Sequence, residues 1–310
     1  MSNILIIKHG SLGDLIQSNG AIKDIKNFFI HSKVFLLTSL PYASFMSECP
    51  YIDQVIIDKR LPRWNLFFLF NLKKILLKYN FTHVFDLQNS SRTKFYKNFI
   101  LTKSKWSSTE TTLEPGQTKK DFDNDPVLDR MELQLKKSQI TTKYIKNIDL
   151  SWVKADLQKL SSQHIEKDYI LIFPFCSKKH QNKKWPFFKD LILKIKQVYQ
   201  NNYPILVAPG PNEIKEANEL EANIILDNKK SIDIKMLISL IYKAKFVIAN
   251  DTGPAHIASH LNKKGIVLFG SHTTAKKVSI GNANFKTLSV KNLSDLNVET
   301  VLDKIKIDLN

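Results

Sequence analysis

The sequence predicts an α/β protein that contains two doubly wound domains. Short apolar runs of strand length alternate with amphipathic stretches of helix length through most of the 310 residues. The strand-like runs at residues 3–8 and 245–251 are apolar on both faces, which is typical of parallel strands covered by helices on each side. The alternation lapses once, at about residues 104–166, and so divides the chain into two α/β halves.

The first half is expected to contain four strands and one long helix. The strands are the runs NILIIK, KVFLLT, QVIID and HVFDLQ, which begin at residues 3, 33, 54 and 83. The helix is expected over residues 14–29, where apolar residues recur at helical spacing directly after the first strand. Another helix is expected over residues 127–140, within the otherwise polar connecting segment.

The second half repeats the same alternation of strands and helices. The strands are YILIFPF, YPILVAPG, NIILD, KFVIAND and GIVLFG, which begin at residues 169, 203, 223, 245 and 265. Helices are expected over residues 186–200, 212–222 and 233–244, after Gly253, and over residues 294–309 from a serine cap. The expected domains are residues 1–160 and 161–292, and residues 293–310 form a helix that packs back on the first domain.

The composition argues against several classes of protein. The start MSNILIIK is predicted to be a strand and not a signal peptide, because it has no basic region before its apolar run. The apolar stretch WNLFFLFNLKKILL is interrupted by Asn71, Lys73 and Lys74, and it falls short of the ~20 residues that span a bilayer. Cys49 and Cys176 are far apart and lack a C-x-x-C spacing, which argues against a disulfide framework. A cytoplasmic protein is expected.

The formal net charge of +17 indicates an anionic partner. Residues 59–105 contain eleven basic side chains and one acidic one, Asp86, together with aromatic residues such as Trp64 and Phe67. This mixture suits nucleic acid or the headgroup zone of an anionic membrane. The aromatic residues could equally form core, with the lysines as its solvated face.

In parallel sheets ligands bind beyond the carboxyl ends of the strands, so the loops that follow strands are where a site is expected. The first of these loops is KHGSLGDL, in which two glycines permit a tight turn and Asp14 lies near the start of a helix. Asp14 could act as a helix cap or as a functional carboxylate. Neither G-x-G-x-x-G nor a P-loop is present.

Two later loops contain residues that suit a phosphate group and a sugar hydroxyl. Lys183 and neighbouring lysines precede Trp185 and Pro186, where Pro186 is expected in the first turn of a helix. Cations there suit a diphosphate, although the loop could also be simply solvated. In VAPGPNE, Gly210 allows an irregular backbone, and Glu213 could favour the helix dipole or bind a sugar hydroxyl.

The stretch VIANDTGPAHIASHL is the most specific in the chain. An apolar strand ends at Asp251, and Thr252 and Gly253 then begin a helix whose first turn carries His256. Backbone amides at the positive end of a helix bind phosphate, whereas a carboxylate binds hydroxyl or ammonium groups. This loop is therefore expected to bind a ligand that carries a phosphate together with hydroxyl or ammonium groups.

Two stretches have the spacing of metal ligands. His256 and His260 are four residues apart, but H-E-x-x-H is absent and no cysteine is near. The run DFDND at residues 121–125 is expected to be an exposed turn ahead of Pro126. No metal site is expected at either stretch.

The stretches ILIIKHGSLGDLIQSNGAIKDIK and NDTGPAHIASHLNKKGIVLFGSHT resemble glycosyltransferase family 9, the ADP-heptose:lipopolysaccharide heptosyltransferases and their relatives. HQNKKWP and APGPNE fall where that family has a K-x-W-P-like segment and a Gly turn followed by Glu. The likeness runs through the whole chain and is weakest at residues 64–149. It implies a GT-B fold, two Rossmann-like domains facing a cleft, with the acceptor on the N-terminal domain and the nucleotide sugar on the C-terminal domain.

The resemblance also implies an inverting transfer without metal or other cofactor. It assigns the general base to Asp14, the acceptor loop to Ser11 and Gly13, and donor binding to Lys183, Glu213, Asp251, Thr252, Gly253 and His256. This sequence has His9 and Gly10 where relatives often have a pair of small hydroxyl residues, and this departure leaves the acceptor open.

The implied partners are a nucleotide sugar, taken as ADP-heptose, and an anionic glycolipid acceptor of the lipopolysaccharide core. A monomer that binds peripherally to the inner face of the cytoplasmic membrane, without nucleic acid, is expected. Two alternatives stay open. One is another GT-B nucleotide-sugar enzyme, with a different donor or with epimerase activity that needs no acceptor, and the other is a basic nucleic-acid-binding protein.

Overall fold

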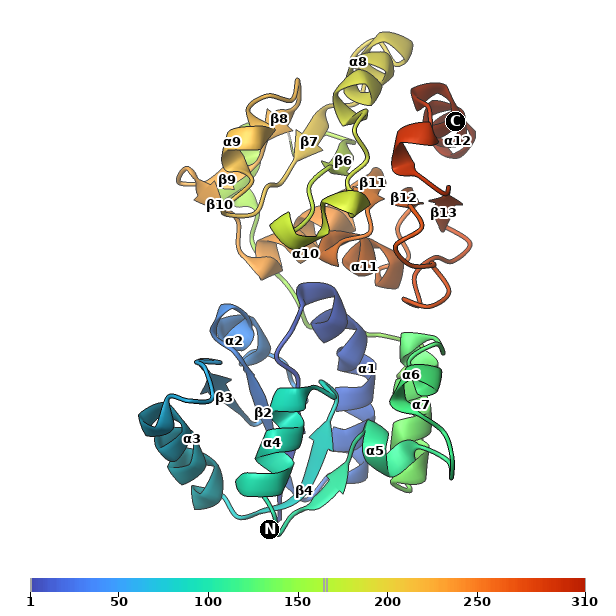
Figure 1. The fold of residues 1–310 in the computed structure, drawn as a ribbon. Coiled ribbons are helices and arrows are strands. Elements are labelled where there is room, and N and C mark those ends of the chain that lie inside the picture. The colour runs from blue at the N-terminus through green and yellow to red at the C-terminus, as the bar shows by residue number, and fades with distance from the viewer. Residues whose placement is uncertain (1, 164, 166, 310) are drawn as a thin grey trace. The chain divides into compact units, whose positions relative to one another are not determined.

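The computed structural model describes residues 2–163, 165 and 167–309 and divides into two compact units, Met1–Trp152 and Val153–Asn310. Each unit contains one main parallel sheet with helices packed against it (Figure 1). The predicted arrangement of two doubly wound α/β halves is therefore confirmed. No helix within the described ranges is both long enough and apolar enough to cross a membrane.

The first unit is built on a five-stranded sheet in the order β3-β2-β1-β4-β5. Its elements are β1 (Asn3–Ile7), α1 (Leu12–Phe28), β2 (Lys33–Ser39), α2 (Leu40–Met46), β3 (Gln54–Asp58), α3 (Leu66–Lys78), β4 (Phe81–Asp86), α4 (Ser91–Phe99), β5 (Lys105–Ser107), α5 (Thr109–Thr112), α6 (Lys119–Phe122) and α7 (Val127–Lys137). All four strand pairs are parallel, and Ile7 at the end of β1 is opposite Leu37 of β2 and Asp86 of β4. The loop that follows β1 therefore leaves from the middle of the carboxyl edge.

Both faces of β1 are covered, which explains why its sequence is apolar from Ile4 to Ile7. Leu5 and Ile7 belong to a core that includes Phe68 and Leu72 of α3. Ile4 and Ile6, which alternate with them along the strand, are also completely buried, because the opposite face of the sheet is covered as well.

The second unit is built on a six-stranded sheet in the order β13-β12-β11-β6-β7-β8, again with parallel pairs throughout. Its elements are η1 (Gln158–Gln163), β6 (Ile170–Phe173), η2 (Lys178–Lys183), α8 (Phe188–Val198), β7 (Ile205–Val207), α9 (Ile214–Ala217), β8 (Asn223–Ile224), β9 (Leu226–Asp227), β10 (Lys230–Ser231), α10 (Ile234–Lys243), β11 (Phe246–Asn250), α11 (Gly253–His260), β12 (Gly265–Phe269), β13 (Phe285–Ser289), η3 (Leu293–Asp295) and α12 (Val298–Leu309).

The C-terminal helix α12 completes the core of the second unit. Val301 and Ile305 belong to the same buried cluster as Trp185 and Leu191, and α12 lies beside α8 (Figure 1). The apolar face of this helix is therefore buried in the second core, whereas the sequence analysis expected it to pack on the first domain.

Several element boundaries differ from those expected. The last helix begins at Val298, because the side chain of Asn297 caps it by accepting a hydrogen bond from the Thr300 N–H at 2.8 Å. Helix α8 begins at Phe188, so Pro186 precedes the helix. The run NIILD divides between two sheets: β8 pairs with β7, whereas β9 turns back through a tight loop to pair with β10.

Candidate functional site

The carboxyl edge of the second sheet gathers most of the residues predicted to bind the donor. Strands β12, β11, β6 and β7 are neighbours in that sheet and run in the same direction. The loops that follow them therefore leave the sheet at one edge, and this is where ligands bind in sheets of this kind.

Asp251, directly after β11, is the centre of this group. Its Oδ2 atom lies 2.6 Å from Lys183 Nζ and 3.1 Å from His272 Nε2, and its Oδ1 atom lies 3.7 Å from His256 Nε2. Burial alone would raise the pKa of the Asp251 carboxyl, but the hydrogen bond and charge of Lys183, with smaller contributions from the two histidines, hold that pKa below its ordinary value. Asp251 is thus a buried, ionised carboxylate.

A set of backbone contacts places Lys183 beside Asp251. The backbone N–H of Trp185 donates to Asn250 Oδ1 at 3.1 Å, and Asn250 Nδ2 donates to the Pro174 carbonyl at 2.8 Å. The Trp185 side chain is completely buried and donates to the Leu296 carbonyl at 2.8 Å. The loop after β6 is therefore tied to the end of β11, and Lys183 is held over the site while its side chain stays partly exposed.

Helix α11 begins at this point, and the groups at its start suit an anion. Thr252 is its N-cap residue and Gly253 is its first residue, so their backbone N–H groups lie at the positive end of the helix. His256 lies in the first turn and is buried. Two amides, a lysine and a histidine next to one another suit a phosphate or diphosphate group.

Glu213 lies at the same edge, after β7, where it closes the glycine turn. Its Oε2 atom accepts a hydrogen bond from the Gly210 N–H at 2.8 Å. Burial raises the pKa of the Glu213 carboxyl, against the opposing effects of that N–H and of Lys184. Glu213, Lys183 and Lys184 all act electrostatically on Cys176, whose pKa is raised mainly by burial, so these loops converge.

In the first unit, Asp14 is the third residue of α1 and forms a capping box with Ser11. The Asp14 Oδ2 atom accepts hydrogen bonds from the Ser11 N–H at 2.9 Å and from the Ser11 hydroxyl at 2.8 Å. Ser11 is exposed, Asp14 is half-buried and Gly13 between them is buried. Asp14 therefore caps the helix, and this contact does not by itself assign it a catalytic role.

Gly10 is required by the backbone and by a neighbouring ring. Its φ of +127° is in the region that favours glycine, and a Cβ atom at this position would lie 2.4 Å from the Tyr42 ring. The pKa of Tyr42 is raised by burial and then by the charge of Asp14. Tyr42 thus covers the loop that carries Asp14.

Four buried polar residues around this loop are not among the predicted site residues, namely Lys8, His9, Asp58 and Asp86. His9 Nε2 lies 2.9 Å from Asp58 Oδ2, and Asp58 also accepts a hydrogen bond from the Tyr96 hydroxyl at 2.6 Å. Lys8 donates to the Leu87 carbonyl at 3.0 Å, and its pKa is lowered by burial against the opposing charges of Asp14 and Asp86. Asp58 and Asp86 each end a strand, and this position could have revealed them. His272, after β12, was missed in the same way.

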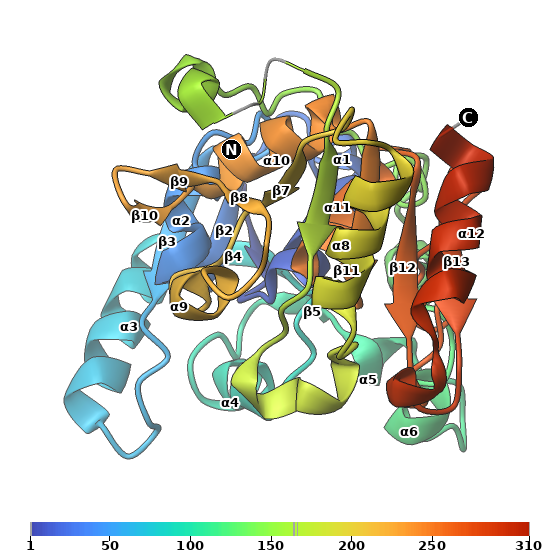
Figure 2. The ribbon, with the colours of Figure 1, turned by 90° about the horizontal axis from the view of Figure 1, so that it is seen from above.

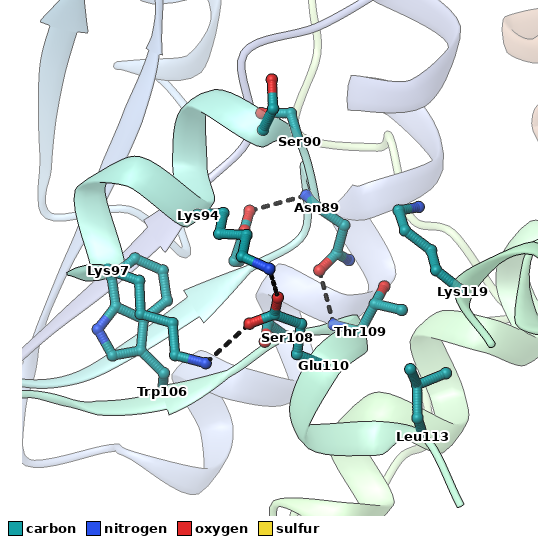
Figure 3. Close-up of a pocket in the computed structure, with 12 residues that line it drawn as sticks. Asn89, Ser90, Lys94, Lys97, Trp106, Ser108, Thr109, Glu110, Leu113 and Lys119 are labelled. Atoms are coloured by element: carbon teal, nitrogen blue, oxygen red, sulfur yellow. Dashed lines mark hydrogen bonds and ion pairs between the residues drawn. The ribbon is translucent and has the colours of Figure 1, made fainter. Parts of the chain in front are cut away.

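A cavity of about 430 Å³ opens beside β4 and β5 (Figure 3). Its lining residues are Asp86, Asn89, Ser90, Ser91, Lys94, Lys97, Trp106, Ser108, Thr109, Glu110, Leu113 and Lys119. Lys94 and Lys97 both point to Glu110, with Nζ to carboxylate distances of 2.6 and 3.1 Å. The cavity therefore combines cations, hydroxyl groups and an indole ring, which suits an anionic sugar.

The two carboxyl groups that line this cavity, Glu110 and Asp86, have pKa values shifted in opposite directions. The hydrogen bonds and charges of Lys94 and Lys97 hold the pKa of the Glu110 carboxyl below its ordinary value. Burial raises the pKa of Asp86, although that carboxylate accepts hydrogen bonds from the N–H groups of Gln88 and Asn89 at 3.0 and 2.9 Å. Because Lys94 and Lys97 share the single negative charge of Glu110, the three side chains together keep a net positive charge that can bind an anionic ligand.

The two stretches with the spacing of metal ligands, residues 121–125 and the pair His256 and His260, interact with neighbouring residues of the chain. Asp121 caps α6 through Thr118, and Asp123 pairs with Lys119 and Arg130, each at 2.6 Å. Burial, with the charge of His256, lowers the pKa of His260 to about 3, which is typical of a neutral, desolvated histidine.

Comparison with known proteins adds a family assignment to this geometry. Residues 69–305 match the family model described as glycosyltransferase family 9 (heptosyltransferase). A relative from Campylobacter coli, described as lipopolysaccharide heptosyltransferase 1, is 27% identical over 305 residues, covering 89% of this chain and 87% of its own.

Solved structures support the fold. A family 9 glycosyltransferase from Veillonella parvula has a TM-score of 0.76 at 16% identity, covering 99% and 97% of the two chains. An E. coli heptosyltransferase solved with ADP has a TM-score of 0.72 at 17% identity, covering 99% of each chain. A UDP-GlcNAc 2-epimerase from Methanocaldococcus jannaschii also matches, with a TM-score of 0.64 at 16% identity, covering 100% of this chain and 93% of the other. The expected GT-B fold is confirmed, and the chain belongs to glycosyltransferase family 9.

Proposed function

We propose that this glycosyltransferase moves a heptose from ADP-heptose to an anionic glycolipid of the lipopolysaccharide core, with inversion at the sugar and without a metal ion. The observation that carries the proposal is the group formed by Lys183, Asp251 and the start of α11 at the carboxyl edge of the second sheet. The relatives named above as heptosyltransferases, one of them solved with ADP, support this choice of donor.

The donor half of the reaction follows from the charges of this group. As the glycosidic bond to the diphosphate breaks, negative charge develops on the leaving phosphate oxygen. Lys183 and the N–H groups of Thr252 and Gly253 would bind that charge, and the partly exposed Lys183 can reach a ligand while Asp251 orients it. Glu213 would hydrogen-bond to a hydroxyl of the nucleoside or sugar, since it lies at the same edge after β7.

The acceptor half needs a base that removes a proton from the attacking hydroxyl. We assign this role to Asp14, because its carboxylate lies at the exposed start of α1, with Ser11 and Gly13 as the surrounding acceptor loop. Lys8, buried nearby, interacts electrostatically with Asp14. A positioned carboxylate base of this kind typically contributes ~10²–10⁴-fold to the rate.

The cavity beside β4 and β5 is a candidate subsite for the acceptor. An acidic or phosphorylated sugar would meet Lys94, Lys97 and the hydroxyl of Ser90, which line the cavity. Anionic groups paired to lysine gain charge-assisted hydrogen bonds. We further propose that the protein acts as a monomer at the inner face of the cytoplasmic membrane, where such a glycolipid acceptor would be presented.

Kinetics of ADP release test this function and the subsite together. The unchanged protein should release ADP from ADP-heptose only when acceptor is added, whereas an epimerase would convert its donor without acceptor. Lys97→Ala should raise the KM for the acceptor roughly ten- to a hundredfold and leave the KM for ADP-heptose unchanged, because one charge-assisted hydrogen bond contributes about 1.5–3 kcal/mol.

Lys103→Ala is the matched control, because Lys103 is exposed nearby and does not line the cavity. Equal acceptor KM values for Lys97→Ala and Lys103→Ala would exclude the cavity as the subsite. Acceptor-independent conversion of the donor would instead exclude the proposed reaction.

A further inference from the structure

The start of helix α3 carries an unusual concentration of exposed apolar side chains. Among the described residues, the three most exposed large apolar side chains are Trp64, Phe67 and Leu66, at 80%, 79% and 74% exposure, and Phe70 follows at 67%. We name these four residues the α3 apolar tip. Single exposed apolar residues are ordinary on protein surfaces, but four of them within residues 64–70 mark an interaction site.

The helical spacing explains why the tip is left uncovered. Phe68, Leu72 and Leu76 form the stripe of α3 that is buried in the core of the first unit. Phe67 and Phe70 lie three residues apart on the opposite side of the helix. Figures 1 and 2 both show α3 at the outer margin of its own unit, and the rings of Phe67 and Phe70 are exposed to solvent. Helix α3 is therefore apolar on two faces, and only one of them is packed.

The tip is surrounded by positive charge. Six basic residues flank it in the sequence, and no Asp or Glu occurs from Lys59 to Lys78. The basic flank consists of Lys59, Arg60, Arg63, Lys73, Lys74 and Lys78, all exposed. Lys74 and Lys78 fall on the same side of α3 as Phe67 and Phe70, because these positions are three or four residues apart. An exposed aromatic group within a carboxylate-free basic flank requires a partner that is both apolar and anionic.

We propose that the α3 apolar tip and its basic flank dock the protein on an anionic lipid bilayer. Aromatic rings partition favourably into the boundary between headgroups and acyl chains, and lysine or arginine side chains beside them are attracted to anionic lipids. A second copy of this chain is a poor occupant of the same surface, since two basic flanks would be brought together.

Arg60 of the basic flank lies close to the loop that carries Asp14. Arg60 acts electrostatically on Tyr42, whose ring covers Gly10 in the loop that carries Asp14. A bilayer bound at the α3 apolar tip would therefore lie near the loop assigned to the acceptor. The inference rests on the proposed function only for the lipid nature of that acceptor, because docking itself needs neither donor nor acceptor.

Flotation with lipid vesicles tests the docking directly. The full chain should bind vesicles that contain phosphatidylglycerol, release from them as salt rises, and bind phosphatidylcholine vesicles at least tenfold more weakly, because salt screens the attraction. The double variant Phe67→Ser, Phe70→Ser should lose at least tenfold in binding to the anionic vesicles. Trp64 fluorescence should shift to shorter wavelength when vesicles are added, and Trp64→Phe should remove that shift.

The control variant is Tyr242→Ser, which changes an equally exposed ring, at 66% exposure, on the second unit. It should bind vesicles like the unchanged protein. All these side chains are exposed, so the melting temperatures should agree, and transfer to a lipid-free acceptor fragment should be the same in every variant. That last result separates docking from the proposed function.

Two results would overturn the inference. One is equal binding of the anionic vesicles by the double variant and by Tyr242→Ser. The other is a dimer in sedimentation that the double variant dissociates, which would assign the α3 apolar tip to contact between two copies.

Discussion

Asp14→Asn should lower turnover by roughly 10²–10⁴-fold and leave the affinity for ADP-heptose near that of the unchanged protein, because a general base contributes about that much to the rate. Asn keeps an oxygen that can accept both hydrogen bonds from Ser11, so the capping box is preserved. The loss of charge near the helix start should cost only about 0.3–1 kcal/mol of stability. Turnover, donor affinity and melting temperature measured on this variant decide the role.

The chain contains a matched control for this variant. Asp121 caps α6 with the same geometry, because its Oδ2 atom accepts from the Thr118 N–H at 3.1 Å and from the Thr118 hydroxyl at 2.6 Å. Asp121→Asn should therefore show a similarly small change in melting temperature and full turnover. If Asp14→Asn is as active as Asp121→Asn, the carboxylate of Asp14 is only a helix cap.

Lys183→Ala should weaken ADP binding by roughly ten- to a hundredfold and leave adenosine binding unchanged. The expected loss is that of a charge-assisted hydrogen bond to a phosphate oxygen, about 1.5–3 kcal/mol. Asp251 would keep its contacts with His272 and His256, so the site should not collapse. Calorimetric titration with ADP and with adenosine separates the effect on the diphosphate from any effect on the nucleoside.

Lys179→Ala serves as the control, because Lys179 is exposed in the same loop and sits outside the group around Asp251. It should preserve the preference for ADP over adenosine. An undiminished preference in Lys183→Ala would mean that Lys183 orders Asp251 and does not touch the diphosphate.

The strands were easier to predict than the site because their signal is local. A strand buried on both faces is apolar at nearly every position, as in ILII of β1 and FVIA of β11. The contacts of Asp251 depend on which strands become neighbours. Lys183 and His272 are distant in sequence from Asp251, and the parallel order β12-β11-β6 is what brings them together.

The pair formed by His9 and Asp58 was missed for a related reason. Asp58 looked like the polar end of the strand QVIID, and only the pairing of β1, β2 and β3 places it within reach of His9. Helix α4 and strand β5 were missed because their short, basic and polar sequences lack a clear period. The cavity that they line could not be predicted without them.

The most direct test of the central claim is the structure of the reaction product. Nuclear magnetic resonance should be recorded on the product formed from ADP-heptose and a heptose-free lipopolysaccharide-core acceptor in the presence of a metal chelator. The account predicts acceptor-dependent transfer at an undiminished rate, with the anomeric configuration opposite to that of the donor. Retention of configuration, loss of transfer in the chelator, or consumption of ADP-heptose without an acceptor would contradict it.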